Sequence, residues 1–419
     1  MGTTLVWFRR DLRLRDNPAL RAAVRRGGAV IPVFVRAPEE ERPWAPGQAS
    51  RWWLARSVAA LDRALRERGS RLIVRSGPTR KALSELARDC GADAIYWNRR
   101  YEPAVAARDA AVEAALPAQT FNSALLFEPG QILNGAGRPF QVFSAFWQAC
   151  QAMPEPPRPE GAPARIPAPL RWPKSETVID RLQELPGWEP GEAGAQARLR
   201  RFLRQAADSY TTDRDRPDLE GTSRLSPHLH FGEIGPRQLW HALRSHEAYL
   251  RELAWREFAY HLLALRPQPE DAAREIDLRS LRLWQNGRTG YPIVDAGMRE
   301  LLATGWMHNR VRMLVASFLV KDLLIPWQAG AAWFWDKLVD ADLANNTLNW
   351  QWVAGRGAGA CPWFRIFNPI TQAKKFDPQG DYVRRWVPEL ERGKAYPPPM
   401  VDHREAARRA RAAKGAGTL

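Results

Sequence analysis

The segment TLVWFRRDLRLRDNPAL, residues 4–20, decides the fold of the N-terminal third. It opens with a short β-branched and aromatic run at residues 4–8, the pattern of a strand. Similar runs recur at residues 29–35, 71–74 and 94–97, and stretches with helical periodicity separate them at residues 52–68 and 79–90. Strands that alternate with helices predict a doubly wound, Rossmann-like parallel sheet that is covered on both faces.

The turn that follows the first run contains no glycine. A dinucleotide pyrophosphate is usually held by a glycine-rich turn at this point of a doubly wound fold. Its absence argues against NAD or FAD pyrophosphate binding in this part of the chain.

The composition points to two chemical features. The chain has 62 basic and 46 acidic residues, a formal charge of +16, which favours a polyanionic partner such as nucleic acid. An arginine-rich proteome with a basic, soluble surface explains that charge equally well, and charge alone leaves both open. The 19 Trp outnumber 15 Phe and 8 Tyr, which indicates stacking or redox chemistry, because a core does not specifically need indole.

The same residues predict an intracellular, cytoplasmic protein. Three cysteines are too few for a disulfide scaffold or a four-cysteine cluster. The charged opening does not resemble a signal peptide, and no apolar run approaches the roughly 20 residues of a membrane span.

A change in composition predicts the domain organisation. Residues 153–190 are rich in proline and unsuited to regular structure. We expect an α/β domain at 1–130, a long Pro-rich linker at 131–195 and a larger all-α domain at 196–419. Within the last, helical periodicity occurs at 196–207, 236–244, 249–265, 295–302, 309–324 and 331–338. The basic tail from Arg404 predicts a frayed helix or disorder.

Several common chemistries lack their motifs. There is no Walker A loop, no HExxH and no GxSxG. His228 and His230 form a half-site at best, without cysteines or carboxylates at a recognised spacing. We therefore predict no metal.

Polar residues gather among tryptophans in the helical half. The stretch GTSRLSPH at 221–228 leads into a helix whose start could bind a diphosphate, although a simple helix cap has the same pattern. Asn309, Arg312 and Met313 share one helix face. Asp340 comes shortly before the WQW sequence at 350–352, and buried charges need partners, so an Arg312–Asp340 ion pair is expected.

These motifs resemble the DNA photolyase/cryptochrome flavoprotein family over nearly the whole chain. The matching stretches are WFRRDLRLRDNPAL at 7–20, NRRYEP at 98–103, GTSRLSPHL at 221–229, ELAWREF at 252–258, GWMHNRVRM at 305–313, the DADLANN and NWQW block at 340–352, and FRIFNPITQ at 364–372. The resemblance implies an α/β antenna domain, a linker and a helical domain that holds FAD in a U-shaped conformation.

The resemblance also implies roles for individual residues. The residues implied to bind FAD are Tyr210, Thr222, Ser223, Arg224, Leu225, Ser226, Tyr249, Trp306, Arg312, Asp340, Asp342 and Asn346. Those implied to hold or act on a flipped pyrimidine dimer are Glu252, Trp255, Asn309, Met313, Asn346 and Trp352. Further DNA contacts are implied for Arg214, Arg256, Arg310, Arg365 and Gln372, and electron transfer for Trp350 and Trp327.

The implied activity is light-driven repair of UV-damaged DNA by a monomer. Reduced FAD passes an electron to a cyclobutane pyrimidine dimer, which opens and returns the electron, so the cofactor supplies the chemistry and the protein binds and orients. Asn309 and Met313 follow the cyclobutane-dimer pattern rather than the histidines of (6-4) enzymes. Asn346 is an amide, as in photolyases, where plant-type cryptochromes carry an acid.

Other interpretations remain open at this point. A cryptochrome-type photoreceptor without repair activity is the main alternative, and a non-enzymatic DNA-binding module leaves the flavin motifs unexplained. The distal electron-transfer Trp is missing from the shortened segment 261–283, and Trp306, Trp333 or Trp335 could replace it. Ala104 and Val105 stand where folate-binding relatives carry a Glu, so a second, antenna chromophore stays unidentified. Nucleoid association would follow from DNA binding, and a preference for single-stranded DNA stays open.

Overall fold

The computed structural model describes residues 2–177, 184–265, 276–357, 364–391 and 395–415. Contacts within the chain define two compact units. Unit 1 comprises Met1–Glu184, Trp188–Leu203 and Arg224–Pro267, and unit 2 comprises Leu185–Gly187, Arg204–Ser223 and Gln268–Leu419. Each unit is described by itself.

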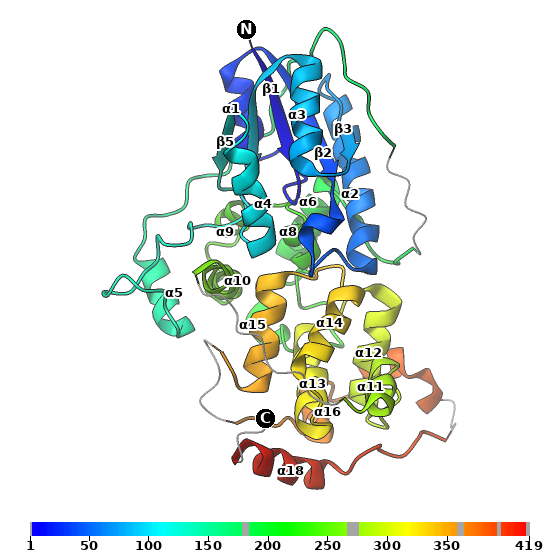
Figure 1. Cartoon of the computed structure of the whole chain (residues 1–419). Coiled ribbons are helices and arrows are strands. Elements are labelled where there is room, and N and C mark those ends of the chain that lie inside the picture. Colours follow the sequence, from blue (N-terminus) through cyan, green and yellow to red (C-terminus); the bar gives the residue numbers. More distant parts are fainter. Residues whose placement is uncertain (1, 178–183, 266–275, 358–363, 392–394, 416–419) are drawn as a thin grey trace. The chain divides into compact units, whose positions relative to one another are not determined.

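Unit 1 contains the predicted parallel sheet, in the order β3-β2-β1-β4-β5 (Figure 1). Its strands are β1 Thr3–Phe8, β2 Ala29–Arg36, β3 Ile73–Ser76, β4 Ala92–Asn98 and β5 Ala118–Phe121. All four neighbouring pairs are parallel, with Leu5 opposite Ile31 on one side and Ile95 on the other. The predicted α/β fold is confirmed, and β5 is an additional strand that the sequence did not indicate.

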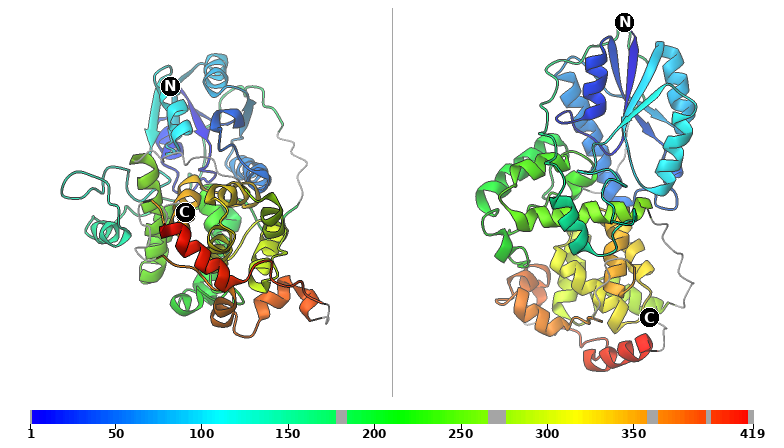
Figure 2. Two further views of the ribbon diagram at one scale, coloured as in Figure 1. Left: turned by 60° about the horizontal axis from the view of Figure 1, so that its bottom comes forward. Right: turned by 90° about the vertical axis from the view of Figure 1, so that its left-hand side faces the viewer.

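Helices connect and cover these strands. They are α1 Pro18–Arg26, η1 Pro38–Glu41, α2 Gln48–Arg66, α3 Thr79–Cys90 and α4 Pro103–Glu113. Figure 2 shows α1 on one face of the sheet and α4 on the other. The core beneath α3 is aliphatic with two tryptophans, Trp7 and Trp97, whose rings meet edge to face at 5.4 Å. Burial of this continuous apolar face is what holds a parallel sheet together.

The connector after β5 packs on the same unit. It contains a short helix, α5 Phe143–Gln151, inside the segment predicted as linker. Further along, its backbone bonds to unit 1, with Val30 N donating to Pro167 O and Ile166 N donating to Arg68 O. The Pro-rich segment is therefore extended and attached where it is described, because its backbone groups find partners at the sheet and in the turn after α2.

Unit 1 also includes helices from the later part of the chain. They are α8 Ser226–His230, α9 Pro236–Ala242 and α10 Glu247–Leu265, while α6 Glu192–Gln205 begins in unit 1. The turn after β1 packs against them. Gly232 (φ +64°) is required there, because a Cβ would lie 2.1 Å from the carbonyl oxygen of Arg10.

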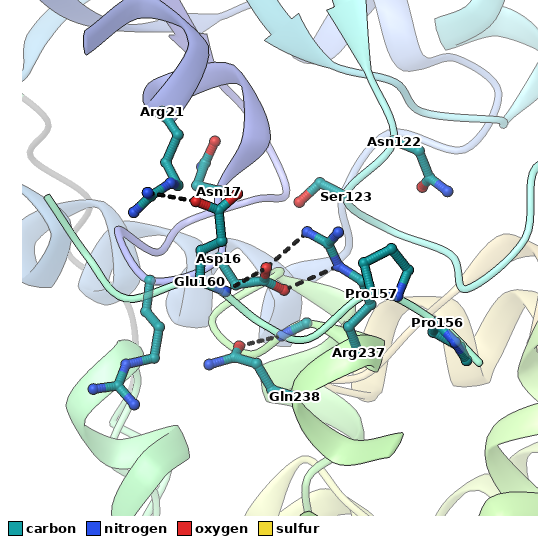
Figure 3. A network of polar contacts seen from close by, with 12 residues as sticks. Asp16, Asn17, Arg21, Asn122, Ser123, Pro156, Pro157, Glu160, Arg237 and Gln238 are labelled. Carbon is teal, nitrogen blue, oxygen red and sulfur yellow. Dashed lines mark hydrogen bonds and ion pairs between the residues drawn. The ribbon is translucent and has the colours of Figure 1, made fainter. Parts of the chain in front are cut away.

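Charged residues of that turn fix the packing. The Arg13 side chain, 1% exposed, donates to the carbonyl of Gly232 at 2.9 Å and to the Ser123 hydroxyl at 2.6 Å. Asp16 accepts from Arg237 at 2.7 Å and from the backbone N–H of Glu160 at 3.2 Å (Figure 3). Within the RDLRLRDN motif, the buried charges of Arg13 and Asp16 thus connect the sheet domain, the connector and α9.

Unit 2 is helical. Its elements are α7 Tyr210–Asp213, α11 Leu278–Gln285, α12 Pro292–Thr304, α13 Asn309–Ser317, the π-helical turn η2 Phe318–Asp322, α14 Trp327–Lys337, α15 Leu343–Ala354, α16 Pro369–Phe376, α17 Asp381–Trp386, η3 Pro388–Leu390 and α18 His403–Gly415. The single helix expected at 309–324 is corrected, since its last turn is a π-helix. The tail from Arg404 is helical up to Gly415 and buries Ala406, Ala407 and Ala410.

No helix in the described part of the chain is long and apolar enough to cross a membrane. His228, which the sequence offered as half of a metal site, is buried against the Glu233 carboxylate instead. Among the described residues, no group of three or more potential metal-ligating side chains comes together.

Candidate flavin and lesion site

The start of α13 in unit 2 carries most of the predicted polar residues. His308 caps the helix, and its Nδ1 accepts from Arg310 N at 3.2 Å. The sequence then presents Asn309, which is exposed, and Met313, which is half-buried. Because residues four apart share a helix face, Asn309 and Met313 lie on one side of α13 as expected.

The predicted ion pair is present. Arg312 Nη2 lies 2.8 Å from Asp340 Oδ2, and Arg312 Nε donates to the carbonyl of Met307 at 2.7 Å. The Arg312 guanidinium also lies 5.7 Å from the centre of the Trp306 ring. Asp340 is 8% exposed, so the charge of each partner compensates that of the other in a mostly dry environment.

Asp342 and Asn346 begin α15. The Asp342 carboxylate caps the helix by accepting from Asn345 N at 2.9 Å. The Asn346 amide nitrogen donates to the carbonyl of Ala331 on α14 at 3.1 Å. That bond assigns the amide orientation, because its nitrogen faces Ala331 and its oxygen is left to accept from another donor.

His308 has a buried donor without a described partner. Since its Nδ1 accepts a backbone N–H, the ring proton of the neutral form lies on Nε2. Burial lowers the pKa of His308 to about 4, so the ring is neutral at pH 7. Nε2 finds no hydrogen-bond partner among the described residues, which is costly unless a bound molecule accepts from it.

Trp350 and Trp352 leave α15 in different directions. Two residues of an α-helix are about 200° apart. Trp350 is 3% exposed and packs against Trp284 at 6.4 Å and Phe334 at 5.1 Å between ring centres. Trp352 is half-buried and lines a separate pocket together with Arg365.

Trp284 is a residue that sequence reasoning missed. It is fully buried, and its indole nitrogen donates to the carbonyl of Val315 at 3.0 Å. Nothing in the sequence pairs residues 284 and 350, because their contact depends on how α11 and α15 pack. Trp327 begins α14 and is half-buried, and part of the segment 261–283, where the distal Trp was sought, lies outside the described residues.

The remaining predicted residues of unit 2 lie on several elements. Arg214 stacks on Tyr210, with its guanidinium 5.4 Å from the ring centre. Arg310 is paired with Asp215 at 2.6 Å. Gln372 is half-buried on α16. Thr222 and Ser223 are the last residues of the segment Arg204–Ser223, which belongs to unit 2.

In unit 1, α10 carries a second group of predicted residues. Glu252, Trp255 and Arg256 follow at helical spacing, so they share one face. Trp255 stacks on Phe143 of α5 at 3.7 Å and 7° between ring planes. Arg256 donates to the carbonyl of Ala124 at 2.7 Å. Phe143 thus fixes the plane of the Trp255 ring.

Of the four other predicted residues of unit 1, three precede α10 and the fourth, Tyr249, lies within it. Arg224 has a left-handed backbone, φ +51°, and its guanidinium lies 4.7 Å over the Trp188 ring. Leu225 and Ser226 lead into α8. Tyr249 is buried and meets the Phe202 ring at 5.3 Å. The predicted site residues therefore form two groups, one in each unit.

Comparison with known proteins assigns the class. Residues 4–164 match the family model of DNA photolyase, and residues 249–394 match that of the FAD binding domain of DNA photolyase. The chain belongs to the DNA photolyase/cryptochrome family.

Individual relatives cover nearly all of the chain. A deoxyribodipyrimidine photo-lyase of Agrobacterium fabrum is 44% identical over 98% of this chain and 97% of its own length. The crystal structure of a class III photolyase from Agrobacterium tumefaciens superposes with a TM-score of 0.92, at 43% identity, over 99% of this chain and 98% of that one. Cryptochrome-1 of Arabidopsis thaliana is 40% identical over 93% of this chain and 63% of its own length.

The described residues fit a flavin cofactor. A flavin and its ribityl diphosphate offer acceptors and anionic oxygens, and unit 2 supplies an oriented guanidinium on Arg312 and a buried donor on His308. The Asn346 amide nitrogen is used by the carbonyl of Ala331, so its amide oxygen would be the atom to accept from a flavin N–H. Among these groups, the buried His308 Nε2 has no hydrogen-bond partner in the described residues, and an acceptor atom of a bound flavin would satisfy it.

Proposed function

We propose that this protein is a light-driven DNA repair enzyme, a deoxyribodipyrimidine photo-lyase that splits cyclobutane pyrimidine dimers. The observation that carries the proposal is the 44% identity to a photo-lyase over almost the full length of both chains. The helix start with Asn309 and Met313, and the Arg312–Asp340 pair on the same helix, offer groups suited to binding the flavin and the dimer.

FAD would supply the electron that opens the dimer on illumination and would take it back afterwards. The protein's own part is to hold and orient. The Arg312 guanidinium carries a fixed positive charge whose position is set by Asp340 and Met307, and Asn346 presents an acceptor whose direction is set by Ala331. Such preorganised groups need no rearrangement at the moment of reaction.

Each unit by itself supplies side chains of the kind that bind a flipped dimer. Trp255 and Trp352 offer aromatic faces for stacking, while Glu252 and Asn309 offer hydrogen-bonding groups to the pyrimidine edges. The other face of Trp255 is already covered by Phe143, so its ring plane is set before DNA arrives. Arg214, Arg310, Arg365 and Gln372 are proposed to contact the DNA backbone.

A second chromophore is assigned to unit 1. The carboxyl ends of β1 and β4 meet where the strand order reverses, which is the usual ligand position of a doubly wound sheet. A pocket lies at this point and is lined by Arg10, Asn98, Arg99 and Tyr101, among others. Acidic side chains line the pocket as well, and Glu102 pairs with Arg10 and Arg100, so the charge of the lining does not select the chromophore. The absorption spectrum of the purified protein after removal of FAD would identify it.

We further propose that the enzyme acts as a monomer in the cytoplasm, associated with the nucleoid through DNA. A cryptochrome-type photoreceptor is the second candidate, favoured by the 40% identity to a plant cryptochrome. The Asn346 amide separates the two, because an acid at this place is the plant-type pattern.

The decisive experiment is illumination of the chemically reduced protein with an oligonucleotide that contains one thymine dimer. Loss of the dimer under blue light, with none in the dark, supports the repair function. A flavin-containing protein that leaves the dimer intact would support the photoreceptor instead.

A further inference from the structure

A cationic pocket in unit 2 lies beside Trp352. Among the described residues that line it are Lys321 of η2, Arg365 of the segment before α16, and Lys414 of α18. Phe364 and Phe367 supply apolar walls. Among the described residues of its lining there are three cations and no acidic residue, so its chemistry suits an anion.

The buried position of Lys321 distinguishes this pocket from a cluster of charges on the surface. Its side chain is 1% exposed, and its ammonium donates to the carbonyl of Ala354 at 2.9 Å. The same nitrogen lies 4.0 Å from the centre of the Phe364 ring, and Lys414 Nζ lies 4.6 Å from that centre. Two ammonium groups thus approach one aromatic ring.

This arrangement has an electrostatic cost in the absence of an anion. Burial, together with the nearby charges of Lys414 and Arg356, lowers the pKa of Lys321 to about 8. A nearby negative charge would favour the protonated form and offset the repulsion. Lys321 alone is explained as a cap of α15, since a cation near the last carbonyls stabilises a helix end. That role does not explain Lys414 and Arg365.

We propose that this pocket binds one backbone phosphate of the damaged DNA strand, next to the flipped dimer, through Lys414 and Arg365 at its mouth and Lys321 at its base. The inference rests on the proposed function, because Trp352 lines this pocket and is assigned to the dimer. It adds two cations and the C-terminal helix α18 to the DNA-binding surface. A phosphodiester fits because it is a compact monoanion with two free oxygens.

The first test is the salt dependence of binding to a duplex with one thymine dimer, measured for Lys414→Gln, Arg365→Gln and the double variant. If both side chains contact one phosphate, the double variant lowers the log–log slope by about 0.9, the value for a single phosphate. A lowering of about 1.8 means two separate phosphates and overturns the shared site. Arg411→Gln on the exposed side of α18 is the matched control, since it removes the same charge outside the pocket.

The second test locates the phosphate. Neutral methylphosphonates replace the phosphates around the dimer one at a time. We expect the unaltered protein to lose about tenfold in affinity at one position, as for a lost charge-assisted hydrogen bond, and the double variant to lose nothing further there. Equal losses in both proteins at every position, or an effect of Arg411→Gln as large as that of Lys414→Gln, overturn the proposal.

Two outcomes separate this site from the proposed function. In the first outcome, inorganic phosphate alone binds tightly and Lys414→Gln removes that binding, but replacing any one phosphate of the DNA lowers the affinity of the unaltered protein and of the double variant equally. The pocket is then a site for a free anion, and the DNA assignment fails. If the unaltered protein neither prefers nor repairs dimer-containing DNA, the proposed function fails and this inference fails with it.

Discussion

Glu252 is the acidic member of the face of α10 that carries Trp255. We expect Glu252→Ala to weaken binding of the dimer by about 10- to 100-fold and to lower the repair yield, because a hydrogen bond to a charged group contributes roughly 1.5–3 kcal/mol. Flavin content should not change. The measurement is the Kd for dimer-containing DNA together with the flavin absorbance. Glu247→Ala, at the exposed start of the same helix, is the control, and equal effects of both variants would count against the role of Glu252.

Glu257, two residues beyond Trp255, is fully buried, and its carboxylate accepts from Leu126 N at 2.8 Å. Burial raises the pKa of Glu257 from 4.5 to about 7. Between these two values the folded protein binds a proton that the unfolded chain does not, so stability falls as the pH rises from about 4.5 to 7. The full contribution is about 3 kcal/mol.

Glu257→Gln should remove this pH dependence, because an amide keeps an acceptor for the backbone N–H groups and does not titrate. Denaturant unfolding at pH 5 and pH 8 measures it: the variant should gain stability relative to the unaltered protein at the higher pH. Parallel pH profiles of the two proteins would show that Glu257 does not titrate in this range.

Three helices, α15, α14 and α11, each carry one tryptophan that we expect to take part in electron transfer to the flavin. We expect Trp350→Phe to abolish photoreduction of the oxidised flavin by an external thiol, because Phe keeps apolar volume but is much harder to oxidise. Trp284 lies 6.4 Å from Trp350 and offers a route beside Trp327. Single changes of Trp284 or Trp327 to Phe should therefore slow photoreduction, and the double change should nearly stop it.

Absorbance of the flavin during illumination follows this reaction. Repair by chemically reduced protein should survive in all these variants, since that electron starts on the flavin. Trp240→Phe, which alters a contact with Trp147 in unit 1, is the control. Normal photoreduction in Trp350→Phe would show that the Trp350 indole serves only the packing of the core.

The elements themselves show what local sequence can and cannot predict. Helix α3 was predicted with its observed bounds, because its periodicity is strong and Gly91 ends it in a left-handed conformation. Strand β5, AQTF, was missed because it has neither alternation nor a run of β-branched residues. The π-turn at Phe318–Asp322 was missed because residue spacing does not separate a π-turn from a continuing α-helix; its Asp322 contacts His403 and Arg409 of α18, which only the tertiary fold brings to it.

The site follows the same division. The Arg312–Asp340 pair was predictable, since two opposite charges in an apolar context need each other. Three other contacts were not predictable, because each joins segments that only the tertiary fold brings together. They are Trp284 with Trp350, Phe143 with Trp255, and Lys414 with the Phe364 ring.

At the scale of the whole molecule, the α/β fold does not end where the Pro-rich connector ends. Trp53 of α2 is fully buried, stacks on Phe231 at 6.0 Å and donates to Glu233 at 2.8 Å. We expect a fragment of residues 1–195 to be unstable, since exposure of that surface costs about 1.5–3 kcal/mol for the Phe231 contact alone. Arg13 would also lose its bond to the Gly232 carbonyl.

Circular dichroism and thermal unfolding of this fragment, compared with a fragment of residues 1–267, test the expectation. The longer fragment should have the higher melting temperature. A short fragment that is monomeric and unfolds cooperatively would show that the sheet domain is independent and ends near residue 195.

The angle between Trp350 and Trp352 has a consequence for how this family changes over time. One helix separates the ring that sits among buried aromatics from the ring that borders the cationic pocket. If the proposed roles hold, substitutions on one side of α15 would alter photoreduction of the flavin, and substitutions on the other side would alter binding of DNA. A lineage could give up repair and keep its light response by changing a few side chains on a single flank of this helix, with its packing against α14 left intact.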